Sequence, residues 1–378
     1  MFRHLKLSYA LHRPTGSIRA VRQASNRASI GVQLGIFLPN WLGDVVMATP
    51  AICALRQMVG ATGRLIGIMR PYVSEILSGT NWLDATILYE KHSGRFPVAS
   101  RDVYQQLRSA ELDHIVLLTN SLRTAWMAFR SGARERIGYA GEMRSWLLTK
   151  RLPRPRAPLA TIDGYLQLAS AAGAKIESRR LELKTTAADE RAADMAWETL
   201  GLPPGERVVL LNSGGAYGAA KRWPADHFAE LARRIVADGR SWVLVNCGPA
   251  ERAIAREIET RSGDPRVVSL ARFDELPIGL TKACIRRSRV VVSTDSGPRH
   301  IAIAFGRPVV TLFGPTDPAA TATNYSGEMS LSLGLECQPC MARVCPLGHH
   351  RCMRELTVER VYAAVRQALH EEIVMDAA

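Results

Sequence analysis

Two buried strands separated by one short helix constrain the fold of this chain more than any other part of its sequence. Residues 290–292 and 309–313 are apolar and rich in β-branched side chains, and a polar loop follows each run. Such runs, joined by a helix of this length, predict parallel strands that are covered on both faces. The two loops then lie at the carboxyl ends of their strands, where open α/β sheets bind ligands. Small residues and a helix amino terminus suit a phosphate-bearing ligand, so a nucleotide or sugar nucleotide is the first hypothesis.

The same alternation of strands and helices runs through both halves of the chain. It favours parallel sheets with right-handed crossovers, and 378 residues suffice for two such domains. The predicted fold class is α/β, with two Rossmann-like domains facing each other across a cleft. Besides the two strands above, strands are predicted at residues 34–38, 64–69, 86–89, 114–119, 208–211, 242–246 and 267–270.

The predicted domain boundaries follow from this alternation. We expect a basic, disordered extension, a first and a second Rossmann-like domain and a carboxyl-terminal helix, over residues 1–30, 31–180, 186–355 and 356–378. The hinge is placed around residues 177–188. The Pro- and Arg-rich segment 150–158 is predicted to be irregular.

Positive charge is the main compositional signal. The formal net charge of +14 favours an anionic partner such as a nucleotide, a phosphorylated glycolipid, a membrane surface or nucleic acid. A basic solvated surface without a dedicated partner is the alternative. Residues 1–30 carry basic but no acidic side chains, which fits a transit-like peptide, a tail that touches anionic lipid, or an extension without a role. Without an export signal or an apolar run of about 20 residues, a cytoplasmic location is expected, free or peripheral to the inner membrane.

A glycine-rich loop between a predicted strand and helix is a candidate phosphate site. Glycines let the backbone approach a ligand and turn its N–H groups toward phosphate oxygens, and a lysine adds positive charge. The loop matches neither the P-loop pattern nor the dinucleotide fingerprint, and a purely structural turn is the alternative. The candidate phosphate-binding residues are Ser213, Gly214, Gly215, Gly218 and Lys221.

Two aspartates and a histidine stand at other strand–helix junctions. Asp44 is either a helix N-cap or a carboxylate that takes a proton from an attacking hydroxyl. Asp295 is either a turn former or an acceptor of hydrogen bonds from sugar hydroxyls. His300 can cap its helix, bind a phosphate or simply pack.

Two further clusters have competing interpretations. Cys337, Cys340, Cys345 and Cys352 are dense enough for a structural zinc site, although their spacing matches no common zinc pattern and a strap with reduced thiols is the alternative. The segment 134–144 is predicted to be a basic loop, which either grips a phosphorylated or carboxylated acceptor or is merely solvated.

Four motifs, taken in order, resemble glycosyltransferase family 9, the bacterial lipopolysaccharide heptosyltransferases. They are Asn-Trp-Leu-Gly-Asp (40–44), Gly-Ala-Tyr-Gly-Ala-Ala-Lys-Arg-Trp-Pro (215–224), Asp-Ser-Gly-x-x-His (295–300) and Gly-Pro-Thr-Asp-Pro (314–318). The cysteine-rich tail is most similar to that of the heptosyltransferase II branch. The resemblance spans about residues 31–368 and implies a GT-B fold. It also implies that residues 31–180 form the acceptor-binding domain and residues 186–355 the nucleotide-sugar-binding domain.

The resemblance also implies an activity, an inverting transfer of heptose from ADP-heptose to the inner core of lipopolysaccharide. Asp44 would be the general base and Lys221 the partner of the departing diphosphate, with no cofactor required. The donor pocket would add Asp295, Ser296, Gly297, His300 and Thr316 to the glycine-rich loop. The candidate acceptor-binding residues are Asn40, Gly43, Arg136 and Arg144.

The chain departs from the family pattern at three places. Residues 1–30 are additional, Pro298 and Arg299 replace a usual apolar pair, and Asn212 and Ser213 replace a usual Pro-Gly. The last two changes leave open a family 9 transferase with a different nucleotide sugar or acceptor. A basic nucleic-acid-binding protein is a weaker alternative because no known binding motif is present, so no nucleic-acid partner is expected. A binding protein without catalysis is disfavoured by Asp44 and Lys221.

Overall fold

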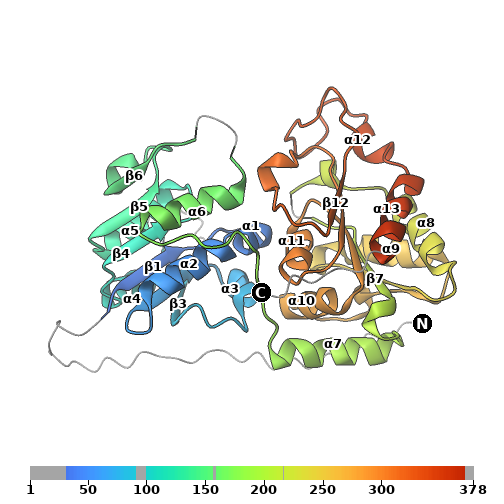
Figure 1. Cartoon of the computed structure of the whole chain (residues 1–378), viewed down its shortest axis with the longest axis horizontal. Coiled ribbons are helices and arrows are strands. Elements are labelled where there is room, and N and C mark those ends of the chain that lie inside the picture. Colours follow the sequence, from blue (N-terminus) through green and yellow to red (C-terminus); the bar gives the residue numbers. More distant parts are fainter. Residues whose placement is uncertain (1–30, 91–98, 156–158, 216, 371–378) are drawn as a thin grey trace.

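Two lobes, each built on a parallel sheet, form the computed structural model, which describes residues 31–90, 99–155, 159–215 and 217–370 (Figure 1). The predicted extension 1–30 lies outside the described residues. Each sheet has six strands, in the orders β3-β2-β1-β4-β5-β6 and β12-β11-β10-β7-β8-β9. Every strand pair is parallel. Read from its third strand, each sheet has the Rossmann order 3-2-1-4-5-6, so each has a switch point between its first and fourth strands.

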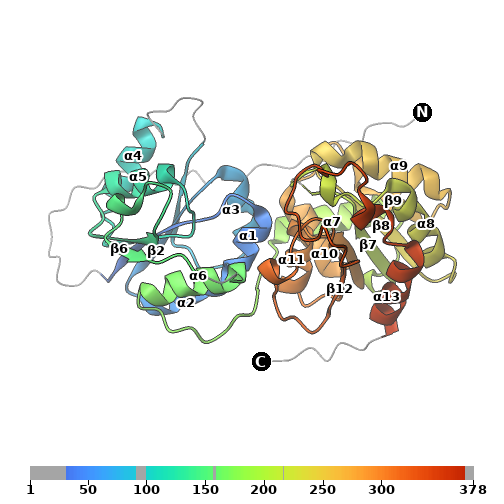
Figure 2. The ribbon, with the colours of Figure 1, turned by 90° about the horizontal axis from the view of Figure 1, so that it is seen from above.

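The first lobe contains the strands β1 (Gln33–Phe37), β2 (Arg64–Met69), β3 (Ala85–Leu88), β4 (His114–Leu117), β5 (Glu135–Tyr139) and β6 (Lys150–Leu152). Its helices are α1 (Leu42–Met47), α2 (Thr49–Val59), α3 (Pro71–Leu77), α4 (Arg101–Ser109), α5 (Leu122–Ser131), η1 (Ser145–Leu147) and α6 (Thr161–Ala171). The central strand β1 is buried along its whole length because helices cover both faces of the sheet (Figure 2).

The second lobe contains the strands β7 (Val208–Asn212), β8 (Trp242–Asn246), β9 (Val267–Ser269), β10 (Val290–Thr294), β11 (Val309–Leu312) and β12 (Glu328–Leu331). Its main helices are α7 (Ala187–Leu200), α8 (Ala225–Val236), α9 (Arg252–Ser262), α10 (Ile278–Arg287), α11 (Gly297–Ala304), α12 (Arg351–Arg354) and α13 (Val358–His370). A capping box between Thr186 and Asp189 starts α7, which packs against α10 after the chain crosses from the first lobe.

The sequence-based assignment of strands was wrong at three places. Segment 134–144 is not one basic loop, because Glu135–Tyr139 forms β5, with Ile137 and Tyr139 buried. Segment 150–158 is not irregular throughout, because its first three residues form the edge strand β6. The edge strand β12 was not predicted. Charged side chains are typical of edge strands, and they hide the apolar signal.

The lobes contact each other chiefly at two helix pairs, and the Thr161 hydroxyl of α6 also donates to the Ala320 carbonyl oxygen of the second lobe at 2.9 Å. Helix α1 lies against α11 in both views, and α3 lies against α10 (Figures 1 and 2). At the second contact the buried Lys282 ammonium donates hydrogen bonds to the carbonyl oxygens of Glu75, at 3.3 Å, and Ser78, at 2.8 Å. No helix in the described ranges is sufficiently long and apolar to span a bilayer.

Candidate active site

Asp44 lies in the first turn of α1, directly after the central strand of the first lobe. The N-cap of α1 is Trp41, and no side chain caps this end, so the N-cap interpretation of Asp44 was wrong. The carboxylate is therefore held at the lobe contact without serving the backbone of its own helix. This position at the end of β1 is the switch point of the first sheet.

The surroundings of Asp44 disfavour its charged form. Burial, with a smaller contribution from the negative charge of Asp295, raises the pKa of Asp44 to about 6 against the opposing effect of Lys221. Both of these charges belong to the second lobe. Asp44 is thus electrostatically coupled across the lobe contact to the residues that follow β7 and β10, and its pKa lies in the range useful for a general base.

Lys221 and Asp295 form a buried ion pair at the carboxyl edge of the second sheet. The Lys221 ammonium donates to the Asp295 carboxylate at 2.8 Å and to the Asp295 carbonyl oxygen at 2.7 Å. It also lies 4.5 Å from the centre of the Tyr217 ring. The Thr316 hydroxyl donates to the same carboxylate oxygen at 2.7 Å. The structure thus brings together three residues that were predicted to bind the donor.

Arg299, noted only as a departure from the family pattern, completes this charge network. Its guanidinium donates to Asp295 at 3.0 Å and to Glu328 of β12 at 2.5 Å, and it is 1% exposed. Burial alone would raise the pKa of Asp295, but the charges of Lys221 and Arg299 and the Lys221 hydrogen bond lower it to about 2. Glu328 was not predicted as a site residue, because β12 itself was not recognised.

The glycine-rich loop after β7 is held mainly by protein contacts. A Cβ added at Gly214 would lie 2.4 Å from the Glu251 carboxyl carbon, and one at Gly218 would lie 2.4 Å from the Arg343 carbonyl oxygen. At Gly215 the nearest atom would be Cβ of Ser296, at 3.4 Å. The close approaches seen here are therefore to protein, and binding of a ligand by these glycines stays a prediction.

A buried amide network supports this loop from below. Asn212 donates to the Gly214 carbonyl oxygen at 3.1 Å and to Ser296 Oγ at 3.2 Å. Asn246, at the end of β8, donates to Asn212 Oδ1 at 2.9 Å. Sequence reasoning missed Asn246, although its place at the end of a predicted strand was a usable signal. Ser213 Oγ is buried and has no hydrogen-bond partner in the described part of the chain.

His300 packs at the lobe contact and does not cap α11, whose N-cap is Ser296. A Cβ added at Gly43 would lie 3.0 Å from His300 Cδ2, and one at Gly297 would lie 3.3 Å from Leu42 Cβ. Burial and the Arg299 charge lower the pKa of His300 to about 3, so the ring is neutral. Within the described ranges its Nδ1 has no hydrogen-bond partner.

The candidate acceptor-binding residues do not form one cluster. Gly43 is at the lobe contact, and Asn40 is exposed with its carbonyl oxygen accepting from the Tyr72 hydroxyl. Arg144 is completely buried and donates to the carbonyl oxygens of Thr119 and Tyr139. These contacts lie within the first lobe, and burial lowers the pKa of Arg144 to about 10.

Arg136, in β5, donates to the carbonyl oxygens of Leu147 and Ala133, at 2.7 and 2.6 Å. These contacts also stay within the first lobe. Arg136 and Arg144 therefore both have a structural role, and their role in acceptor binding stays a prediction.

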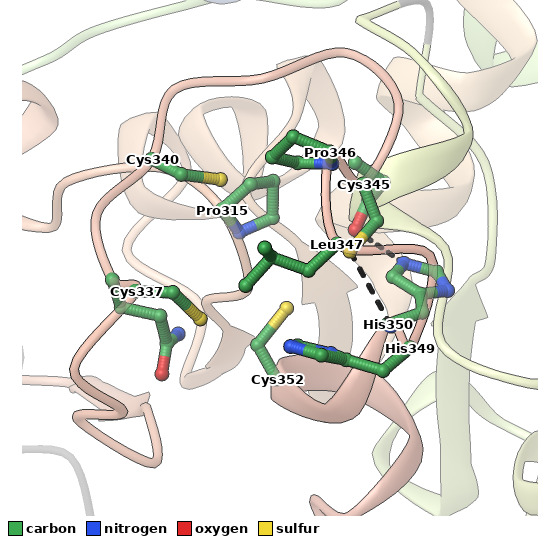
Figure 3. A pocket seen from close by; sticks show the side chains of 11 residues that line it. Pro315, Cys337, Cys340, Cys345, Pro346, Leu347, His349, His350 and Cys352 are labelled. Atoms are coloured by element: carbon green, nitrogen blue, oxygen red, sulfur yellow. Dashed lines mark hydrogen bonds between the residues drawn. The ribbon is translucent and has the colours of Figure 1, made fainter.

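The four cysteines of the tail surround one small cavity of about 20 Å³ beside the glycine-rich loop (Figure 3). All four are free thiols. Over the described ranges, no three His, Cys, Asp or Glu side chains are already arranged as ligands of one ion. The predicted zinc site therefore stays a prediction.

Comparisons with known proteins agree with the geometry. The model of glycosyltransferase family 9 (heptosyltransferase) matches residues 100–351. Lipopolysaccharide heptosyltransferase 2 of Escherichia coli K12 is 26% identical over 357 residues, which cover 88% of this chain and 97% of that protein. Lipooligosaccharide heptosyltransferase 2 of Haemophilus ducreyi is 27% identical over 350 residues, with coverages of 88% and 97%.

Solved structures show the same fold. ADP-heptose lipopolysaccharide heptosyltransferase II of E. coli superimposes with a TM-score of 0.72 at 21% identity, covering 89% of this chain and 98% of that one. A family 9 glycosyltransferase of Veillonella parvula gives 0.76 at 20% identity, with coverages of 90% and 97%. The predicted fold class is confirmed, and the chain belongs to glycosyltransferase family 9, the heptosyltransferase family, as its four motifs indicated.

Proposed function

We propose that this enzyme transfers heptose from ADP-heptose to a sugar hydroxyl of the lipopolysaccharide inner core, with inversion at the anomeric carbon. The observation that carries the proposal is the electrostatic coupling of Asp44 to the Lys221–Asp295 pair across the lobe contact. It joins a carboxylate whose pKa is near neutrality to a buried cation at the carboxyl edge of the opposite sheet. The names of the relatives supply the donor and acceptor classes.

In the proposed reaction the acceptor hydroxyl attacks the anomeric carbon while the bond from that carbon to the diphosphate oxygen breaks. The hydroxyl proton passes to Asp44, and the bonding electrons leave with ADP. The transition state is oxocarbenium-like, as in other glycosyl transfers. Inversion requires the base and the leaving group on opposite faces of the sugar. Asp44 in one lobe and Lys221 in the other suit that arrangement.

Lys221 is positioned to neutralise the departing diphosphate. An ammonium has three N–H donors, and Asp295 accepts from two of them. The third donor is then free for a phosphate oxygen. Because the pair is buried and fixed before the donor arrives, little reorganisation is needed as negative charge develops. We propose that these groups neutralise the leaving group without a divalent metal ion. Transfer at the same rate with and without added Mg²⁺, in a buffer that contains neither divalent cations nor chelator, would support this, and transfer that occurs only when Mg²⁺ is added would contradict it.

We further propose that the enzyme attaches peripherally to the cytoplasmic face of an anionic membrane, where a lipid-linked acceptor would reside. An exposed aromatic cluster on the first lobe supports this. Trp146 is 64% exposed and Phe129 is 43% exposed. The Trp126 ring centre lies 5.8 Å from that of Phe129 and 6.4 Å from that of Trp146. Arg136 lies over Phe129 at 5.6 Å, and Arg130 and Arg134 are exposed in the same segment.

This aromatic cluster joins α5, which follows β4, to η1, which follows β5. Aromatic and basic side chains together suit the headgroup region of an anionic bilayer. We expect Phe129→Ser/Trp146→Ser to weaken binding to phosphatidylglycerol vesicles several-fold. Met195→Ser, at an exposed position of α7 in the other lobe, is the matched control. Equal sedimentation of all three proteins with these vesicles would contradict the assignment.

The test of the transfer reaction compares the parent enzyme with Asp44→Asn, using ADP-heptose and heptose-deficient lipopolysaccharide core. Asparagine keeps the shape of the side chain but cannot take the proton. We expect kcat to fall by about 10²- to 10⁴-fold while ADP binding is retained. Equal turnover would remove Asp44 from the reaction. Absence of transfer by a parent enzyme that binds ADP would contradict the proposed donor or acceptor.

A further inference from the structure

The cysteine-rich strap, residues 332–350, lies between β12 and α12 and contains neither helix nor strand. It exposes several apolar side chains, with Met341 at 50%, Val344 at 72% and Leu347 at 62%. A segment that buries so little apolar surface needs another source of order. The cavity of about 20 Å³ within it is lined by Cys337, Cys340, Cys345 and Cys352, together with His349 and His350 (Figure 3).

We propose that the thiolates of Cys337, Cys340, Cys345 and Cys352 bind one thiophilic metal ion, Zn²⁺ or Fe²⁺, that fixes the strap. Four cysteines are the ligand set of tetrahedral structural sites for these metals. The cavity exceeds the roughly 10–15 Å³ that one water-sized particle requires. Cys337 and Cys340 have the two-residue spacing common in such sites.

One backbone donor contacts the sulfur of Cys345. The His350 N–H donates to the Cys345 sulfur at 3.4 Å. A thiolate is the form of cysteine that binds metal. Binding through four thiolates releases the protons of the thiols to solvent.

The histidines already have other partners, so the thiols are the better ligands. His350 Nε2 donates to the Ala220 carbonyl oxygen at 2.6 Å, and His349 Nδ1 accepts from the Arg351 N–H at 3.0 Å. No three ligand side chains in the described ranges yet converge. Binding therefore requires the thiols to turn inward and the Leu347 side chain, which lies among them in Figure 3, to turn out.

The strap also contacts the loop that carries Lys221, which gives the metal a positioning role. The Ala220 N–H donates to the Arg343 carbonyl oxygen at 3.0 Å, and the Tyr217 hydroxyl donates to the Met341 carbonyl oxygen at 2.5 Å. A strap fixed by metal would hold Tyr217 and Lys221 in place for the diphosphate. This second step rests on the proposed function, whereas metal binding itself does not.

The first experiment measures zinc and iron per chain by mass spectrometry in full-length enzyme purified under reducing conditions without chelator. We expect about one equivalent of one metal, as for a structural site of high affinity. Cys340→Ser, at an exposed position, should lose the metal, whereas Cys53→Ser in the first lobe should keep it. X-ray absorption should show four sulfur neighbours at about 2.3 Å for zinc.

Less than about a tenth of an equivalent, both as purified and after addition of equimolar Zn²⁺ or Fe²⁺ under reducing, anaerobic conditions, would overturn the site. So would equal metal content in Cys340→Ser and Cys53→Ser, because the metal would then be held elsewhere. Thermal melting of each variant separates loss of metal from loss of the fold.

The second experiment measures ADP affinity before and after removal of the metal with a chelator. We expect the dissociation constant to rise about tenfold and to recover when the metal returns, an effect of the size seen for residues that orient a site from behind. Unchanged ADP affinity after complete removal would overturn the positioning role and leave a purely structural metal. Neither measurement requires transfer activity, so failure of the proposed reaction would be distinguishable.

Discussion

The carboxyl edges of the two sheets carry one buried aspartate each, and the two have opposite electrostatic character. Burial acts in the same direction on both, yet the pKa of Asp44 rises to about 6 and that of Asp295 falls to about 2. The difference lies in their partners. Asp295 has Lys221 and Arg299 within hydrogen-bonding distance, whereas Asp44 meets the Lys221 charge only across the lobe contact.

The two sheets have the same strand order, yet their aspartates suit two different roles. Asp295 remains charged at every ordinary pH and organises cations, which suits a site for a diphosphate. Asp44 can exchange a proton near neutral pH, which suits a base. The two environments move the pKa values of these carboxyl groups apart. One group can then stabilise charge while the other transfers a proton.

Neutralising Asp295 should have the largest effect and tests the contrast between the two aspartates most strongly. In Asp295→Asn, Lys221 and Arg299 remain buried with one negative partner removed. We expect the free energy of unfolding at pH 7 to fall by about 3–5 kcal/mol, measured by denaturant titration. Because the folded pKa of Asp295 is depressed, its contribution is present above about pH 4 and is lost as the pH falls toward 2. Asp194→Asn, at a side chain 67% exposed, is the control and should have little effect. Equal effects of both variants would contradict the comparison.

Removing the cation tests the same site through catalysis. We expect Lys221→Met to lower kcat by about 10²- to 10³-fold, because a fixed charge on the leaving group is lost. ADP affinity should fall as well, since Lys221 would contact the diphosphate in the ground state. Lys175→Met, at a side chain 86% exposed, should match the parent enzyme in both measurements. Unaltered kcat in Lys221→Met would exclude this lysine from charge stabilisation.

Asp44 should affect stability in the opposite sense from Asp295. Because its folded pKa is raised, the stability it contributes is full below about pH 4 and is lost as the pH rises through 6. Asparagine carries no charge to desolvate, so Asp44→Asn should increase the free energy of unfolding at pH 8 by up to about 3 kcal/mol. At pH 4 the variant and the parent should be equal. If the difference in free energy of unfolding between the variant and the parent did not change with pH, burial would not be raising the pKa of Asp44.

The smallest expected effect concerns the contact that couples the two regions. In Gly43→Ala the new methyl group would meet His300, 3.0 Å away, so that α1 and α11 must separate slightly. We expect kcat to fall by about tenfold or less. The reacting groups must be aligned for transfer, and the displacement between the lobes is small. Thermal melting should be almost unchanged. A large drop in melting temperature without loss of kcat would point to a packing role alone.

The central strands were predictable because fully buried parallel strands are continuous apolar runs, as in β7, β8 and β10. Their carboxyl ends then located Asp44, Lys221 and Asp295. The edge strands β6 and β12 carry charges and were not recognised, and with β12 the ion pair of Glu328 with Arg299 was missed.

Burial of single polar side chains was the other gap. Arg144 looks like a surface cation in the sequence, but it is completely enclosed and bonded to carbonyl oxygens. The pKa of Asp44 depends on charges more than 170 residues away in the chain, which no local pattern encodes. Chain positions predicted where the site lies, whereas its electrostatics required the tertiary structure.

The most direct test of Asp44 as the base is the pH dependence of kcat/KM for transfer from ADP-heptose, which reports ionisations of the free enzyme. We predict that kcat/KM falls on the acidic side with an apparent pKa of about 6, and that the residual activity of Asp44→Asn lacks this step. A parent profile that stays flat down to pH 4, or an identical step in Asp44→Asn, would contradict the assignment of Asp44 as the base.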